Sequence, residues 1–216
     1  MNTRTIRFAL LRPARSAALA LALVLGAAAP MAHAIEEPAY TVLREYPGFE
    51  LREYAPRLVA EVRVSGPADE AGNRGFRPLA GYIFGGNKGA RSIAMTAPVT
   101  QSAAPTQIAM TAPVTQQPAG DATLVQFTMP AEFSLATLPE PLDPQVRLRE
   151  EPAARYAVIR YSGSWSQENY LEHLRKLESG VQAAGLRARG EPVYARYNAP
   201  YVPWFMRRNE IWLPVD

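Results

Sequence analysis

The sequence predicts an α+β domain with a mostly antiparallel sheet, made of two structurally equivalent halves. Residues 51–66 (LREYAPRLVAEVRVSG) align without a gap to residues 148–163 (LREEPAARYAVIRYSG) at an offset of 97, and seven of the sixteen positions are identical. Each half reads in the same order: two segments that alternate apolar and polar residues, a helical segment, and further alternating segments. This order favours an antiparallel sheet with helices packed against it.

In the first half, residues 49–54 and 57–64 have the period-2 alternation of half-buried strands. Ala55 and Pro56 mark the turn between these two strands. Residues 68–84 predict an irregular helix, because glycines and one proline weaken it. We expect that helix to end at the Gly-Gly-Asn sequence of residues 85–87.

In the second half, residues 146–151 and 155–161 are the equivalent strands, and the Pro-rich residues 139–144 connect the halves. Residues 166–184 predict a well-formed helix, because Ser166 can cap its start and Gly185 can end it. The apolar stripe of this helix consists of Tyr170, Leu174, Leu177 and Val181. Further strands are predicted at residues 93–100, 108–115, 124–129, 193–197 and 210–215.

A nine-residue segment, IAMTAPVTQ, occurs at residues 93–101 and again without change at residues 108–116. In one interpretation it is a duplicated binding strand, with Met95 and Met110 as soft ligands for a metal or haem. In the other, the two copies form a hairpin whose methionines fill the core.

Residues 1–34 have the order of a secretory signal peptide. A basic stretch precedes an apolar run at residues 17–29, and Ala-His-Ala at residues 32–34 is a cleavage site. The run is shorter than the ~20 residues that a membrane-spanning helix needs. We therefore expect a single domain of residues 35–216, with halves of about 40–138 and 145–216. We expect it to be exported to the periplasm or secreted, without a membrane span.

The composition excludes several classes of partner and cross-link. Four of the 23 Lys and Arg residues lie in the leader, which contains no Asp or Glu, so residues 35–216 carry 19 basic and 20 acidic residues. The net charge of −1 gives no electrostatic basis for binding nucleic acid. The chain has no Cys, so it uses no disulfide.

The sequence predicts no catalytic site. It contains no Cys nucleophile, no G-x-S-x-G elbow, no Gly-rich phosphate loop before a helix and no H-E-x-x-H motif. His173 is the single histidine after residue 34. It is interpreted either as an axial haem ligand or as a partly packed histidine at the edge of the core.

Two segments can form the walls of a pocket for a flat apolar molecule. One is an aromatic loop near the C-terminus that prolines stiffen, and the other is the first helix. The predicted binding residues are Tyr201, Trp204, Phe205 and Arg207 from the loop, with Arg74, Phe76, Arg77 and Ala80 from the helix. The arginines could pair with carboxylates of the ligand. Alternatively, the aromatic residues only close a barrel, and Arg208 and Glu210 are structural.

Several motifs together resemble the SOUL haem-binding family and cover nearly all of residues 35–216. They are YTVLREYPGFELREYAP (40–56), YIFGGN (82–87), IAMTAPV (93–99 and 108–114), VQFTMP (125–130), SG (162–163) and RRNEIWL (207–213). The resemblance implies a distorted antiparallel β-barrel of two pseudo-symmetric halves with two flanking helices. It also implies non-covalent binding of haem or another tetrapyrrole in a hydrophobic cleft between the first helix and the loop before the last strand.

The sequence departs from the family at the site itself. The basic positions that are thought to meet the haem propionates align with Asn73, Gly81 and Val202, which are uncharged, while Arg74, Arg77 and Arg207 lie nearby. The architecture also resembles effector-binding domains of transcriptional regulators, so the fold alone does not fix the ligand. Two alternatives therefore stand beside a tetrapyrrole-binding protein: a binding module for other hydrophobic small molecules, and a ligand-free interaction protein of the cell envelope.

Overall fold

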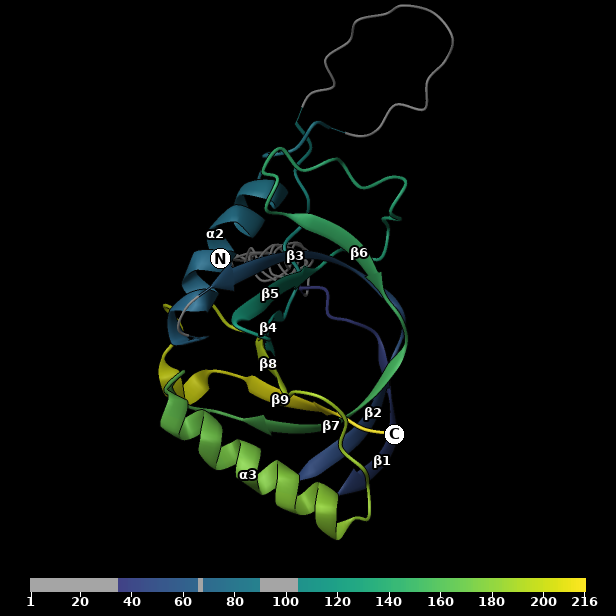
Figure 1. Cartoon of the computed structure of the whole chain (residues 1–216), viewed down its shortest axis with the longest axis vertical. Coiled ribbons are helices and arrows are strands. Elements are labelled where there is room, and N and C mark those ends of the chain that lie inside the picture. Colours follow the sequence, from purple (N-terminus) through teal and green to yellow (C-terminus); the bar gives the residue numbers. More distant parts are fainter. Residues whose placement is uncertain (1–34, 66–67, 90–104) are drawn as a thin grey trace, which may run out of the picture. The chain divides into compact units, whose positions relative to one another are not determined.

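The computed structural model describes residues 35–65, 68–89 and 105–216 (Figure 1). The predicted signal peptide and the first copy of the nine-residue motif lie outside these residues. The described strands form one antiparallel sheet in the order β1-β2-β7-β9-β8-β4-β5-β3-β6. The strands are β1 (Tyr40–Tyr46), β2 (Phe49–Tyr54), β3 (Arg57–Ser65), β4 (Val114–Ala119), β5 (Ala122–Thr128), β6 (Arg147–Glu151), β7 (Ala154–Tyr161), β8 (Val193–Arg196) and β9 (Asn209–Pro214).

The sheet curls into an open barrel with a helix on each side, α2 (Ala68–Ile83) and α3 (Gln167–Ala183) (Figure 1). The predicted fold class, an α+β domain built on a distorted antiparallel barrel with two flanking helices, is confirmed. Both helices begin and end within one residue of the predicted bounds.

The two halves exchange strands in a symmetric way. Strand β2 of the first half pairs with β7 of the second, and β6 of the second pairs with β3 of the first. In the first of these ladders Leu51 lies opposite Ala157, and in the second Leu148 lies opposite Ala60. The two pairs are related by the offset of 97 found in the sequence, so the halves share strand register as well as strand order.

The first helix packs closely on the outer face of β3 and β5. Leu79, Tyr82 and Ile83 are buried in one cluster with Val62 and Val125 of these strands. Gly75, which was expected to weaken this helix, allows the close approach to the sheet. A Cβ atom on Gly75 would lie 2.6 Å from the side chain of Val125.

The second helix has the predicted apolar stripe. Leu177 and Val181 pack against Ile211 of β9 and Ala157 of β7. The Ser166 hydroxyl accepts a hydrogen bond from the backbone N–H of Asn169, as expected for an N-cap. The first half of the stripe, at Tyr170 and Leu174, faces a cavity that is described below.

The strand prediction was wrong in two places. Residues 108–113 are not in a strand, and β4 begins only at Val114. Pro113 has no N–H to donate to a ladder, so the strand starts after it. The segment is held instead by a hydrogen bond from the Ile108 N–H to the Ile83 carbonyl. The second difference is β1, an edge strand paired with β2 that was not among the predicted strands.

Candidate functional site

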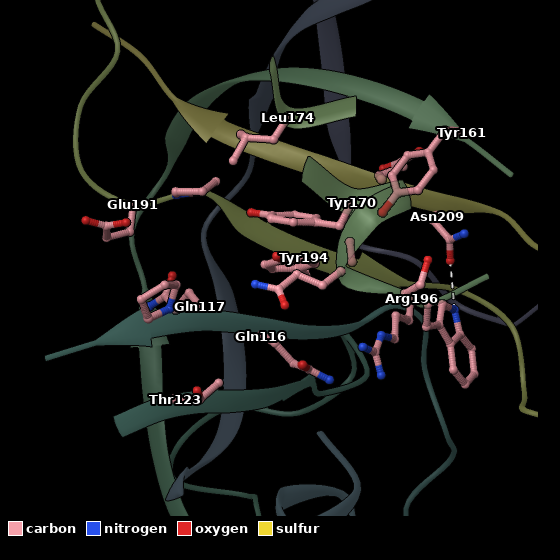
Figure 2. Close-up of a pocket in the computed structure, with 17 residues that line it drawn as sticks. Gln116, Gln117, Thr123, Tyr161, Tyr170, Leu174, Glu191, Tyr194, Arg196 and Asn209 are labelled. Atoms are coloured by element: carbon pink, nitrogen blue, oxygen red, sulfur yellow. Dashed lines mark hydrogen bonds between the residues drawn. The ribbon is translucent and has the colours of Figure 1, made fainter. Parts of the chain in front are cut away.

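A pocket of about 460 Å³ opens between the first half of α3 and strands β4 and β8 (Figure 2). Aromatic side chains from three elements form its walls: Tyr161 of β7, Tyr170 of α3 and Tyr194 of β8. The rings of Tyr170 and Tyr194 stack on each other. Burial raises the pKa of all three hydroxyl groups, that of Tyr194 to about 12. The aromatic walls are therefore uncharged at neutral pH.

Several polar side chains also line the pocket, beside apolar residues such as Leu174 and Pro192. Gln116, Gln117 and Thr123 come from β4 and β5, on the side of the pocket opposite α3. Glu191 and Arg196 lie at opposite ends in Figure 2. The pocket therefore combines flat aromatic surface with amide and hydroxyl groups and one charge of each sign at its ends.

The Arg196 guanidinium lies over the indole of Trp165, 4.8 Å from the ring centroid. The Arg207 guanidinium lies over the same indole at 4.3 Å. Trp165 is fixed by a 2.9 Å hydrogen bond from its Nε1 to Oδ1 of Asn209. Burial lowers the pKa of Arg196, and the groups that act on its charge within the described residues include Arg207 and two tyrosines but no carboxylate.

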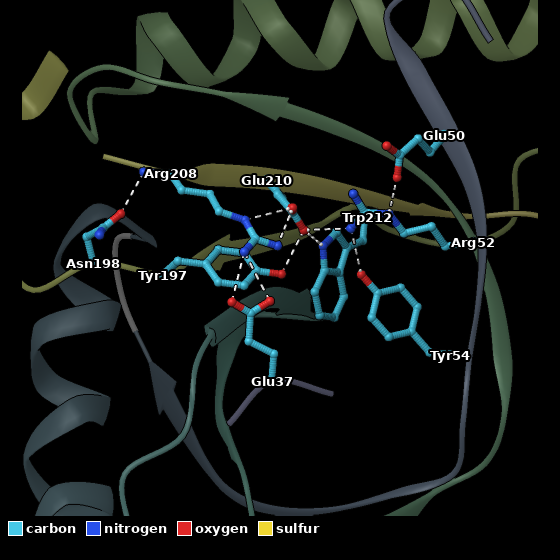
Figure 3. Close-up of polar contacts among 9 residues, drawn as sticks. All are labelled: Glu37, Glu50, Arg52, Tyr54, Tyr197, Asn198, Arg208, Glu210 and Trp212. Atoms are coloured by element: carbon cyan, nitrogen blue, oxygen red, sulfur yellow. Dashed lines mark hydrogen bonds and ion pairs between the residues drawn. The ribbon is translucent and has the colours of Figure 1, made fainter. Parts of the chain in front are cut away.

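Glu210 of β9 is completely buried at the centre of a separate polar cluster (Figure 3). Its Oε2 accepts hydrogen bonds from Arg52 Nη1 at 3.1 Å, the Tyr197 hydroxyl at 2.7 Å and Trp212 Nε1 at 2.8 Å. Its Oε1 accepts two hydrogen bonds from Arg208, at 2.9 and 3.1 Å. Burial alone would raise the pKa of Glu210, but the arginines and hydrogen bonds hold it below its ordinary value.

The cluster continues on both sides of Glu210 and leaves its charges paired. Arg52 also donates to Glu50 at 2.6 Å and to the Tyr54 hydroxyl at 3.2 Å. Arg208 donates to both carboxylate oxygens of Glu37, at 2.8 and 3.0 Å. The geometry thus fits a structural role for this cluster, which joins β2, β9 and the segment before β1.

The predicted binding residues on α2 lie along its exposed side. Arg74 donates to the Ser65 carbonyl at 2.7 Å, and Arg77 is exposed. Phe76 is more than one third exposed and packs edge-on against Phe127 at a centroid distance of 5.3 Å. Ala80 is half-buried.

The predicted binding residues of the C-terminal loop are mostly at the surface. Tyr201 is exposed, and Trp204 and Phe205 are 61% and 62% exposed with their rings in an edge-on contact at 5.7 Å. Arg207 donates to the Val202 carbonyl at 2.8 Å and to that of Pro200 at 2.7 Å. Arg207 therefore closes the loop on itself and joins it to Trp165 at the edge of the pocket.

His173 lies half-buried on α3. Its ring stacks on Tyr161 with centroids 4.2 Å apart, and its Nδ1 is 2.8 Å from the Asn169 carbonyl oxygen. A carbonyl oxygen can only accept, so Nδ1 is the donor in this contact.

The match to a family model decides the family. The model described as SOUL heme-binding protein matches residues 35–214 of this chain. The chain belongs to the SOUL heme-binding protein family. Among curated relatives, heme-binding protein 2 of Homo sapiens is 30% identical over 190 residues, which cover 84% of this chain and 87% of that protein. Heme-binding protein 1 of Mus musculus is 25% identical over 148 residues, which cover 68% of this chain and 73% of that protein.

The fold of this SOUL family member also recurs in solved structures of low sequence identity. The crystal structure of the EcmrR C-terminal domain superimposes with a TM-score of 0.54 at 12% identity, covering 82% of this chain and 98% of that chain. A hydrolase from Listeria innocua gives a TM-score of 0.53 at 12% identity, covering 81% and 94%. These likenesses show a shared fold and nothing about activity.

Residues 35–65, 68–89 and 105–216 contain no group of three or more His, Cys, Asp or Glu side chains that could hold a metal ion. No helix within those ranges is long and apolar enough to cross a membrane.

Sequence reasoning missed the pocket beside α3. Trp165 and Arg196 lie 31 residues apart in the sequence, and their stacking depends on how β8 and the start of α3 meet in space. The alternation of β8 did carry a signal, because Tyr194 and Arg196 face α3 while Val193 and Ala195 pack in a cluster with Trp212. No comparable signal in the sequence shows that the helix leaves a cavity there.

Proposed function

We propose that this protein binds haem or another tetrapyrrole non-covalently and does not catalyse a reaction on it. The observation that carries the proposal is the match of the SOUL family model to residues 35–214, supported by relatives that are named for haem binding. The lack of a catalytic motif in the sequence supports a binding role.

We propose that the ligand lies on the predicted residues of α2 and of the C-terminal loop. These residues fit an apolar ring system with carboxylates, because exposed aromatic rings lie in the loop and exposed guanidinium groups lie on the helix. Trp204 and Phe205 offer ring faces to solvent, and Arg77 has an exposed cation. Covering these exposed aromatic rings with a flat ligand would remove apolar surface from water, which favours binding.

The predicted residues can contact the apolar porphyrin ring and its propionates, but they include no histidine, cysteine or methionine that would ligate the iron. When bound, haem supplies an iron atom that can take a further ligand or exchange an electron. His173, the one histidine after residue 34, is on α3, where its Nδ1 is engaged with the Asn169 carbonyl oxygen. The proposal therefore rests on apolar contact and arginine–propionate pairing, and His173 is not part of it.

A variant in which Arg74, Arg77, Trp204 and Phe205 are all replaced by Ala tests this site. Protoporphyrin IX, which has the same ring and propionates without iron, should bind this variant at least about tenfold more weakly than wild type, equivalent to about 1.4 kcal/mol. Quenching of tryptophan fluorescence would report the affinity, with circular dichroism to verify the fold.

The matched control replaces Arg187 and Leu142, which are exposed and lie outside the predicted site. This variant should bind protoporphyrin IX as wild type does. Unchanged affinity in the fourfold variant would show that the site assignment is wrong.

A further inference from the structure

We propose that the pocket between α3 and strands β4 and β8 is a second binding site, for a small planar aromatic anion whose negative group pairs with Arg196. This site is distinct from the predicted tetrapyrrole site, because none of the eight predicted binding residues lines the pocket, although one of them, Arg207, contacts Trp165 at its edge. Its volume of about 460 Å³ lies in the range of about 300–1,000 Å³ that is usual for small-molecule sites.

The charge of the ligand follows from the balance of groups in the lining. Among the described residues that line the pocket, Arg196 is the one that is basic. Glu210 reaches the lining as well, but its carboxylate is already satisfied by two arginines, a tyrosine and a tryptophan. Glu191 is exposed and lies at the far end in Figure 2. Within the described lining, the unpaired charge at the Arg196 end is therefore positive.

Arg196 is held ready for an anion without being paired to one. It lies over Trp165, which the hydrogen bond to Asn209 keeps in place. A cation–π contact positions a guanidinium but leaves its N–H groups available in the ring plane. The Arg207 guanidinium also lies over the Trp165 indole and places a second positive charge near Arg196. A bound anion would offset this repulsion and the cost of burying Arg196, and burial is the cause of the lowered pKa of that residue.

The shape of the ligand follows from the walls. Tyr161, Tyr170 and Tyr194 are uncharged and present flat ring surface. Such surfaces favour planar aromatic groups over flexible chains. Gln116 and Thr123 also line the pocket, and their side chains can donate and accept hydrogen bonds.

The test uses two fluorescent probes with the same aromatic rings, one of which is an anion and the other uncharged. 8-Anilinonaphthalene-1-sulfonate is an anion with a planar naphthalene ring system, and N-phenyl-1-naphthylamine has the same rings without the sulfonate. We expect wild type to bind one equivalent of the anionic probe and to bind the neutral probe more weakly. Arg196→Gln should weaken the anionic probe about tenfold and leave the neutral probe unchanged, whereas Arg196→Lys should keep part of the affinity.

Two further variants distinguish this pocket from other apolar surfaces. Leu174→Trp would fill the cavity and should weaken both probes. The double variant Trp204→Ala and Phe205→Ala removes exposed aromatic rings of the loop and should leave both probes bound. Circular dichroism and thermal unfolding would verify that each variant is folded.

Three results would overturn the proposal. The first is anionic-probe binding that Arg196→Gln does not change. The second is probe binding that the loop variant abolishes. The third is displacement of the anionic probe by one equivalent of protoporphyrin IX, which would mean that the two ligands share one site. Failure of protoporphyrin IX to bind at all would contradict the proposed function but not this pocket.

Discussion

At the scale of single residues, the main charged feature of the core is Glu210. A carboxylate with no solvent exposure is expensive unless it is fully paired, and here five hydrogen bonds from four side chains satisfy it. Its position could be predicted in part, because the alternation of residues 210–215 places Glu210 on the same face as Trp212. That Arg52, 158 residues earlier, would reach it could not be predicted.

We expect Glu210→Gln to lower the free energy of unfolding at pH 7 by about 3–5 kcal/mol, because it leaves Arg52 and Arg208 without their shared partner. The pKa of Glu210 is lowered in the folded protein. Its stabilising effect is therefore complete above the ordinary glutamate pKa and is lost as the pH falls through the lowered value. Urea unfolding at pH 7 and at successively lower pH would measure both effects.

The control for this prediction is Glu53→Gln, which breaks an exposed ion pair with Arg155. That change should cost less than about 1 kcal/mol. The difference in stability between wild type and Glu210→Gln should shrink on acidification. A constant difference, or a cost at Glu210 as small as at Glu53, would contradict the role given to the cluster.

At the scale of elements, the period-2 alternation located most strands within two residues, because each half-buried strand shows one face to the core. The segment 108–113 misled the prediction. Ile108, Ala112 and Pro113 are buried through loop contacts, such as the hydrogen bond from Ile108 to the end of α2, and not through a ladder, while Met110 is 42% exposed. Strand β1 was missed because its side chains are mostly exposed and show little alternation in burial.

Replacing a glycine of α2 by alanine should change stability in opposite directions at Gly75 and at Gly81. Gly75→Ala would improve helix propensity by about 1 kcal/mol, but its Cβ atom would lie 2.6 Å from Val125 and 3.1 Å from Val62. We expect the overlap to prevail, with a net loss of about 1–3 kcal/mol of stability.

Gly81→Ala is the matched control, because no atom lies within 4 Å of its Cβ position. It should leave stability unchanged or raise it by up to about 1 kcal/mol. Thermal unfolding of both variants measures the contrast. Equal effects at the two positions would show that close packing does not explain the glycines.

At the scale of the whole molecule, the halves are interlocked. Strands β2 and β7 pair across the halves, as do β3 and β6, and β4 of the first half pairs with β8 of the second. The repeat in the sequence predicted two similar halves, and the ladders add that each half completes the sheet of the other. The resemblance to the SOUL family located the expected ligand surface, but the pocket beside α3 depends on contacts between distant residues that no motif records.

The most direct test of the central claim is a titration of the purified protein with haemin and with protoporphyrin IX. The Soret band and tryptophan fluorescence would be followed together. The account predicts saturable one-to-one binding of both molecules at micromolar concentration or below, with a Soret shift that persists in His173→Ala. If neither molecule gives saturable binding, the protein is not a tetrapyrrole-binding member of its family, and another hydrophobic small molecule becomes the leading candidate ligand.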